Sequence, residues 1–216
     1  DLFYKNKKKL PPNLIKKIEN ELKNIEKKTK KNFGDIKNPL LVSVRSGARI
    51  SMPGMMDTIL NLGLNDKTVE GLKKKTSNGR FAKDSYRRFI QMYGNVVLGV
   101  DGHLFEELIE NYKLTKGVLL DTDLDESDWD GLIITFKDLI KKEKKINFPQ
   151  SVKDQLLGAI SAVFLSWNSQ RAKTYRKLNR IPDHWGTAVN IQAMVFGNMG
   201  NDCATGVVFT RNPSTG

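Results

Sequence analysis

The chain has 216 residues, of which 39% are hydrophobic, and carries a formal net charge of +12 at pH 7. This length and apolar content allow a buried core and exclude a disordered tail, while no apolar run reaches the ~18 residues of a membrane-spanning helix. One cysteine, Cys203, excludes an internal disulfide framework. Because the first residues also lack a signal-peptide pattern, we expect a cytoplasmic protein with no membrane partner.

The positive charge is concentrated near the N-terminus. Residues 5–31 are rich in lysine and contain no aromatic residue. Proteins that read bases rely strongly on arginine, and nonspecific nucleic-acid binders often place aromatic residues among their basic ones. We therefore interpret this segment as the solvated face of a helix and expect no nucleic-acid partner.

The first third of the chain is predicted to form a helix, a strand and a loop. A helix over 11–31 begins at two prolines and has apolar residues near helical spacing. The β-branched apolar run at 39–44 predicts a buried strand. After a glycine-containing loop, we expect a short helix over 59–62, capped by Asp57 or Thr58.

The rest of the chain is mainly helical until its last thirty residues. Apolar spacing predicts helices, in chain order, over 67–75, 80–93, 102–112 and 126–144. Gly94 is expected to end the second of these, and a long helix is expected over 151–178. Strand-like runs follow at 188–196 and 205–210. This order predicts an α+β or mixed α/β fold with a helical insertion.

The segment 41–58 contains the clearest signal for a ligand site. It reads LVSVRSGARISMPGMMDT, with an arginine at the end of the predicted strand and two glycines in the loop. Glycines let backbone N–H groups converge on an anion, and Arg45 or Arg49 supplies a forked donor that matches a phosphate. The predicted helix after Asp57 would add its positive end. A structural turn with surface arginines is the alternative.

Two further stretches are weaker candidates. The strand around Gln192 could hydrogen-bond a purine through its backbone, with Met194 and Val195 as apolar surface for the ring, or it could be an ordinary core strand. The last predicted strand delivers Thr210 and Arg211 to a turn that contains Pro and Gly, which is a plausible phosphate contact.

Other motifs do not support a metal centre or a nucleophile. The acidic run 121–126 lacks the glycine and the closing glutamate of a calcium loop, so a helix N-terminus explains it better. His103 and His184 have no partner at ligand spacing and are interpreted as loop or capping residues. Ser46 and Ser51 have no companion base. We therefore predict no metal ligand within this chain.

At these residues the chain resembles the pyruvate, phosphate dikinase family, over about 33–216. The resemblance rests on VSVRSGARISMPGMMDTILNLGLND, on FAKDSYRRFIQMYG, on the whole stretch 148–198, which ends in DHWGTAVNIQAMVFGN, and on GVVFTRNPSTG. The related phosphoenolpyruvate synthases share the arginine-serine strand end but have an acidic loop where this chain has Met52–Met56. That difference favours the dikinase family, with a synthase-like enzyme as the alternative.

The resemblance implies part of an ATP-grasp nucleotide-binding domain, in which two lobes clamp ATP, with an inserted helical subdomain. Residues 1–64 would form part of the first lobe, and 65–150 would form the insertion. Residues 151–190 would continue the first lobe, and 191–216 would contain the hinge and the start of the second lobe.

The resemblance also assigns roles to residues. Arg45 would contact the ATP phosphates as the catalytic residue, the loop through Gly54 would close over them, and the strand from Gln192 to Val195 would be the adenine-side hinge. The implied nucleotide-binding residues are Ser46, Gly47, Ser51, Met52, Pro53, Gly54, Met55, Asp57, Thr58, Gln192, Met194, Val195, Thr210 and Arg211.

Members of this family interconvert ATP, phosphate and pyruvate with AMP, diphosphate and phosphoenolpyruvate through a phosphohistidine. The resemblance implies that an ATP-contacting lysine precedes Asp1 and that the Mg²⁺ ligands follow Gly216. It also implies that a phosphohistidine domain and a pyruvate-binding barrel belong to the same enzyme, which is expected to be a homodimer. We expect the 216 residues alone to be inactive. A non-enzymatic basic binding module remains an alternative.

Overall fold

The computed structural model describes residues 2–216, and its N-terminal part is helical. A short helix, α1 (Leu2–Lys5), precedes the longer α2 (Pro12–Thr29), which begins at a proline because the first turn needs no N–H from that residue. The stripe formed by Ile18, Leu22 and Ile25 packs against the main core, whereas most of the lysines are exposed. The predicted basic helix with a solvated face is therefore confirmed.

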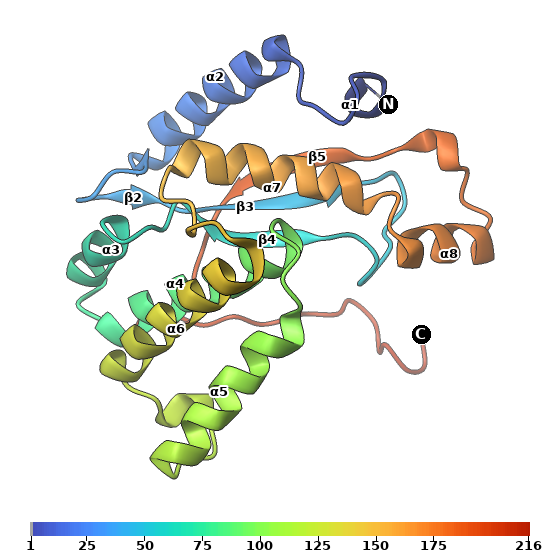
Figure 1. The fold of residues 1–216 in the computed structure, drawn as a ribbon. Helices are drawn as coiled ribbons and strands as arrows, with labels where there is room; N and C mark the ends of the chain where they lie inside the picture. Colours follow the sequence, from blue (N-terminus) through green and yellow to red (C-terminus); the bar gives the residue numbers. More distant parts are fainter. Residues whose placement is uncertain (1) are drawn as a thin grey trace.

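A three-stranded antiparallel sheet occupies the centre of the molecule (Figure 1). Its strands are β3 (Val42–Gly47), β4 (Thr58–Leu62) and β5 (Ala188–Ala193), in the order β4-β3-β5. A separate parallel pair joins β1 (Asn32–Phe33) to β2 (Pro39–Leu40). Since β3 and β4 are joined by a loop, while β5 comes from far along the chain, the central strand connects both halves of the sequence.

The prediction of a helix over 59–62 is wrong, because these residues belong to β4. Ile59 pairs with Val44, and Leu62 pairs with Val42. A bulge lies between these pairs, and Asn61 there has a φ of 60°. Ile59 and Leu62 are both fully buried, so pairing with β3 places them in the core, and the tertiary contact outweighs the local capping signal.

Four helices follow the first two long strands. They are α3 (Thr68–Thr76), α4 (Gly79–Val96), α5 (Gly102–Lys116) and α6 (Glu126–Lys144), and the single-turn η1 (Asp121–Asp123) precedes the last of them. The predicted bounds of α6 are confirmed. Gly94 does not end α4 as predicted. A Cβ at Gly94 would lie 2.7 Å from the Phe105 ring, so the glycine allows α5 to pack closely instead.

The long helix predicted over 151–178 is two helices, α7 (Val152–Ser166) and α8 (Gln170–Leu178). The break at Trp167–Ser169 is stabilised on both sides. The Ser169 hydroxyl accepts a hydrogen bond from Ala172 N at 3.3 Å, which caps α8, and the buried Arg176 donates to the Trp167 carbonyl. A second single turn, η2 (Asp183–Trp185), then leads to β5.

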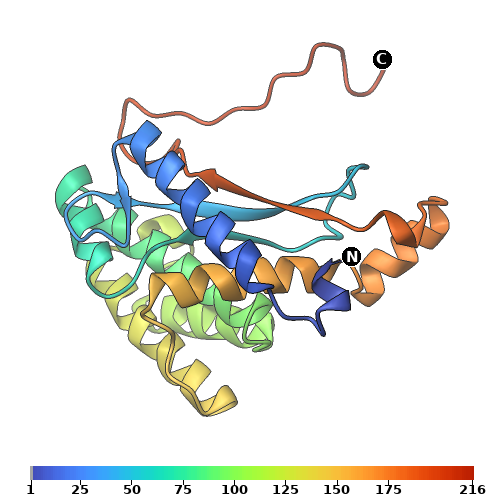
Figure 2. The same ribbon diagram turned by 90° about the horizontal axis from the view of Figure 1, so that it is seen from above.

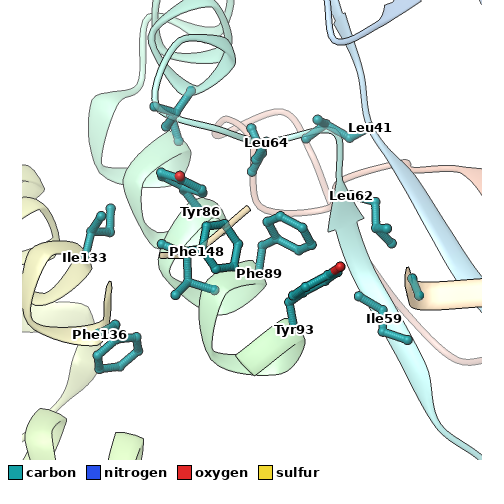
Figure 3. Close-up of a cluster of buried hydrophobic side chains, with 14 of the residues drawn as sticks. Leu41, Ile59, Leu62, Leu64, Tyr86, Phe89, Tyr93, Ile133, Phe136 and Phe148 are labelled. Carbon is teal, nitrogen blue, oxygen red and sulfur yellow. The ribbon is translucent and has the colours of Figure 1, made fainter. Parts of the chain in front are cut away.

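The main core lies between the sheet and the helices. Figure 3 shows side chains of β4, α4 and α6 packed together, with Phe148 among them. The rings of Phe89 and Tyr93 both meet Phe148 edge to face, at centroid distances of 5.6 and 5.7 Å. One continuous cluster therefore joins the helical region to the sheet, and the fold is α+β.

The segment after β5 leaves the sheet on the side away from α7 (Figure 2). The strand predicted over 205–210 is wrong: within residues 2–216 this stretch forms no strand, and Val208 is 92% exposed. A strand needs a neighbour to take up its backbone groups, and none of the described strands pairs with this stretch. None of the helices in the described part of the chain has the length and hydropathy of a membrane span.

Candidate functional site

A hollow of about 390 Å³ lies where β3 ends, and most of the predicted phosphate-site residues line it. The end of β3 and the β3–β4 loop, residues 48–57, form most of its lining, and β5 contributes Asn190. Of the predicted residues, the hollow brings together Arg45, Ser46, Gly47, Ser51, Met52, Pro53, Gly54 and Thr58. Its lining contains no carboxylate among residues 2–216, so its charge is positive and suits an anion.

Arg45 is positioned by the sheet. It lies in the central strand, with Thr58 of β4 and Asn190 of β5 as its neighbours in register. Its side chain is exposed, and none of the ion pairs formed within residues 2–216 includes it. A guanidinium held by a strand and unengaged by any described carboxylate is available for a phosphate.

Two glycines shape the hollow for different reasons. Gly54 has a φ of +72° with no atom within 4 Å of an added Cβ, so its backbone conformation favours glycine. Gly47 has an ordinary φ, but a Cβ there would lie 3.0 Å from Nδ2 of Asn190. That glycine allows β5 to approach the end of β3. Asn190 is thus a lining residue that the sequence-based set omitted, because only strand pairing places it beside Arg45.

A second, smaller hydrophobic cluster supports the loop. Met52, Trp167 and Ile181 are buried in it, and Met55 packs against them with other loop residues. Met55 was predicted to bind nucleotide, but the structure places its side chain on this support and outside the lining of the hollow. The loop is therefore held by the region around α8, which lies beside it at the same end of the sheet (Figure 1).

Asp57 also lies outside the lining, at the base of the loop. It caps no helix, contrary to the sequence-based expectation, because the residues after it form β4. Its carboxylate forms an ion pair with Arg171 of α8, and its backbone N donates to Ser166 Oγ at 3.1 Å. Burial raises the pKa of Asp57, and the Arg171 guanidinium opposes that rise.

The purine-side candidates are not part of this hollow. Gln192 lies in the edge strand β5 and lines a separate hollow beside α2. Met194 N donates to the Leu41 carbonyl at 2.9 Å, which occupies one backbone group that a purine could have used. Val195, Thr210 and Arg211 are exposed in or next to the segment without regular structure.

The remaining sequence motifs have structural roles. Asp125 of the acidic run caps α6 by accepting hydrogen bonds from Ser127 N and Asp128 N, which confirms the helix-start interpretation. His103 lies in the first turn of α5, where its backbone N donates to Asp101. Across residues 2–216, no three His, Cys, Asp or Glu residues come together as a possible metal site.

Comparison with known proteins confirms the family resemblance seen in the sequence. Residues 6–216 match the family described as pyruvate phosphate dikinase, AMP/ATP-binding domain. Among similar proteins, the pyruvate, phosphate dikinases of Rhizobium meliloti and Clostridium symbiosum are 56% and 55% identical over 96% and 99% of this chain. The chloroplastic enzyme of Flaveria pringlei is 55% identical over 99% of the chain.

The chain spans about a quarter of the length of these relatives, namely 23%, 25% and 22%. The family match nevertheless covers nearly all of the 216 residues, including β3, the loop and β5. The chain therefore belongs to the pyruvate phosphate dikinase AMP/ATP-binding domain family.

Proposed function

We propose that this chain binds the phosphates of ATP in the hollow at the end of β3, as the nucleotide-binding portion of a pyruvate, phosphate dikinase. The observation that supports this most directly is Arg45, which lies at the strand end beside a glycine-containing loop, in a hollow to which no carboxylate of residues 2–216 contributes. Because a phosphate carries several charged oxygens, a forked guanidinium and nearby backbone N–H groups bind it together.

We further propose an ATP-grasp arrangement with the division that the family resemblance implies: lobe residues 1–64 and 151–190, a helical insertion at 65–150, and a hinge with the start of a second lobe at 191–216. The position of β5 at a sheet edge supports it, since such a strand can lead from one lobe to the next. In this proposal Gln192, Met194 and Val195 face the adenine side.

The parent protein would convert ATP, phosphate and pyruvate into AMP, diphosphate and phosphoenolpyruvate through a phosphohistidine on another domain. Within the described residues the hollow has no carboxylate ligand for Mg²⁺, so these residues do not fit the metal and we assign it to other parts of the parent. The phosphohistidine domain, the pyruvate-binding barrel, the homodimer and a cytoplasmic location remain proposals for that parent.

Calorimetric titration with ATP tests the proposal. The wild-type chain should bind saturably, and Arg45→Ala should weaken binding by about 10- to 100-fold, as expected for loss of a charge-assisted hydrogen bond. Arg180→Asn is the matched control. It removes an exposed arginine outside the lining of the hollow and keeps a residue type that tolerates the φ of 53° found there.

Two outcomes would contradict the proposal. ATP binding that is equal in the Arg45→Ala variant and in the wild type would remove Arg45 from the site. The chain could instead bind both ATP and single-stranded DNA, with affinities that fall steeply with salt and are equal in the wild type and Arg45→Ala. That result would indicate a basic module without a specific nucleotide site.

A further inference from the structure

One side chain outside the lining of the hollow connects the β3–β4 loop to α8. Arg171 lies in the first turn of that helix and contacts the loop at two points. Its Nε donates to the Met55 carbonyl at 3.1 Å, and its terminal nitrogen forms an ion pair with Asp57. In each contact the two residues are 114 or more positions apart along the chain, so only the fold brings them together.

The two contacts lie between the tip of the loop at Gly54 and its base at Asp57. Gly54, which precedes Met55, has a φ of +72°, and an added Cβ there would have no atom within 4 Å, so no side-chain packing restrains the backbone at Gly54 itself. The Arg171 guanidinium bonds both the Met55 carbonyl and the Asp57 carboxylate. Because it is planar and forked, it restrains both the position and the direction of the loop backbone. The lining residues Gly54 and Thr58 therefore stand on either side of the restrained segment.

The helix that carries Arg171 is itself firmly held. Arg176, on the same helix, is only 1% exposed, and its guanidinium lies 4.1 Å from the centroid of the Trp167 ring. Its Nε donates to the Asp183 carboxylate at 2.7 Å, and Trp167 packs against Met52 of the loop. Because α8 is fixed to the support under the loop, Arg171 restrains the loop against a rigid element.

Arg171 also neutralises the Asp57 carboxylate at the base of the loop. The Asp57 side chain is 22% exposed, and burial disfavours its ionised form. Without Arg171, an uncompensated carboxylate at the base of the loop would either repel a bound phosphate or take up a proton. The ion pair removes this repulsion while the backbone hydrogen bond sets the geometry.

We propose that Arg171 is a positioning residue that holds the β3–β4 loop in its anion-binding shape through Met55 and Asp57. This inference rests on the proposed function, since the loop is the proposed phosphate site. Arg171 does not line the hollow and is given no contact with the nucleotide. It acts through the loop backbone and through the charge of Asp57.

The first test needs no nucleotide. Amide hydrogen exchange of residues 48–57 should be faster in Arg171→Gln than in the wild type, because the Met55 and Asp57 contacts are lost. Lys173→Gln is the matched control, since it removes an exposed positive charge from the same helix. Arg171→Lys keeps the charge but not the forked group, so its exchange rate should lie between those of the wild type and Arg171→Gln. Unchanged exchange in Arg171→Gln would overturn the inference.

The second test separates positioning from a general loss of structure. Calorimetry should show ATP binding about 3- to 30-fold weaker in Arg171→Gln, with the affinity for adenosine, which has no phosphate, unchanged. In the double variant Arg171→Gln/Asp57→Asn, the loss of ATP affinity should be no larger than in Arg171→Gln alone, because the uncompensated Asp57 carboxylate is removed as well. Equal weakening of ATP and adenosine, together with a lowered melting temperature, would reduce Arg171 to a structural residue and overturn the inference.

The two proposals fail in distinguishable ways. If the wild type does not bind ATP while Arg171→Gln still accelerates exchange of the loop, the proposed function fails and the restraint by Arg171 stands. If the wild type binds ATP through Arg45 and Arg171→Gln changes neither exchange nor affinity, the proposed function stands and the positioning role fails.

Discussion

Tyr93 of α4 contacts residues of several elements at once. Its ring contacts Phe89 and Phe148 edge to face, and its hydroxyl lies against α7, where a Cβ on Gly158 would come within 2.5 Å of the oxygen. Burial, with a smaller contribution from Asp154, raises the pKa of Tyr93 from 10.0 to about 12. The residue therefore keeps its proton in the folded protein after the unfolded chain has lost it.

This pKa shift predicts a loss of stability in alkali. The contribution of Tyr93 is complete below the unfolded pKa of 10.0 and is lost as the pH rises through about 12. Between about pH 9 and about pH 11, the wild type should lose roughly 1 kcal/mol more unfolding free energy than Tyr93→Phe. Urea unfolding of both proteins at the two pH values measures this difference, and equal losses would contradict the prediction.

At the scale of elements, α4 owes its start to a local signal. The Asn78 side chain accepts a hydrogen bond from Phe81 N at 2.9 Å, after Ser77 has turned the chain with a φ of 52°. This cap leaves the apolar face of α4 in register with the core, where it packs against α6 and β4. The helices α6 and α7 also begin with a side-chain cap, at Asp125 and Ser151 respectively.

Removing the α4 cap should destabilise the protein measurably. We expect Asn78→Ala to lower the unfolding free energy by about 1 kcal/mol, because the first turn loses an acceptor for its N–H groups. Asn78→Ser is the control, since serine also caps helices and should restore most of the loss. Thermal unfolding followed by circular dichroism measures both, and a serine variant as unstable as the alanine variant would show that capping is not the cause.

For the whole molecule, the main consequence of the fold is that one core serves both the sheet and the helical region. Phe89 and Tyr93 of α4 lie toward β4, and Phe136 of α6 belongs to the same cluster (Figure 3). The Phe136 ring also packs edge to face on Phe105, at a centroid distance of 4.9 Å. Such shared packing favours cooperative unfolding of residues 65–150 together with the sheet.

Two tryptophans can report on this cooperativity. Trp129 lies in the helical region and Trp167 under the loop, so variants in which Trp185 and one of these two tryptophans are replaced follow each part separately. We expect coincident urea transitions, and Phe136→Ala should lower the unfolding free energy seen by both probes by about 3–5 kcal/mol. Separate transitions, with only the Trp129 signal shifted, would show that residues 65–150 unfold as an independent unit.

The sequence alone determined the features that depend on neighbours along the chain. Caps and apolar spacing located α6 to the residue, and the arginine-glycine pattern at 41–58 located the hollow. Caps and helical faces arise from contacts within a few residues, so a linear pattern contains them. The association of this pattern with the dikinase family likewise needed no coordinates.

Only the tertiary structure decided the features that depend on distant contacts. Residues 59–62 follow a helix-start signal but form a strand because β3 pairs with them, and residues 205–210 have a strand-like composition but pair with no strand in the described part of the chain. Asn190 reaches the hollow through strand register, and Arg171 reaches the loop through the break between α7 and α8. Backbone pairing and packing across the chain decide such features, and no local pattern records which distant residue supplies the partner.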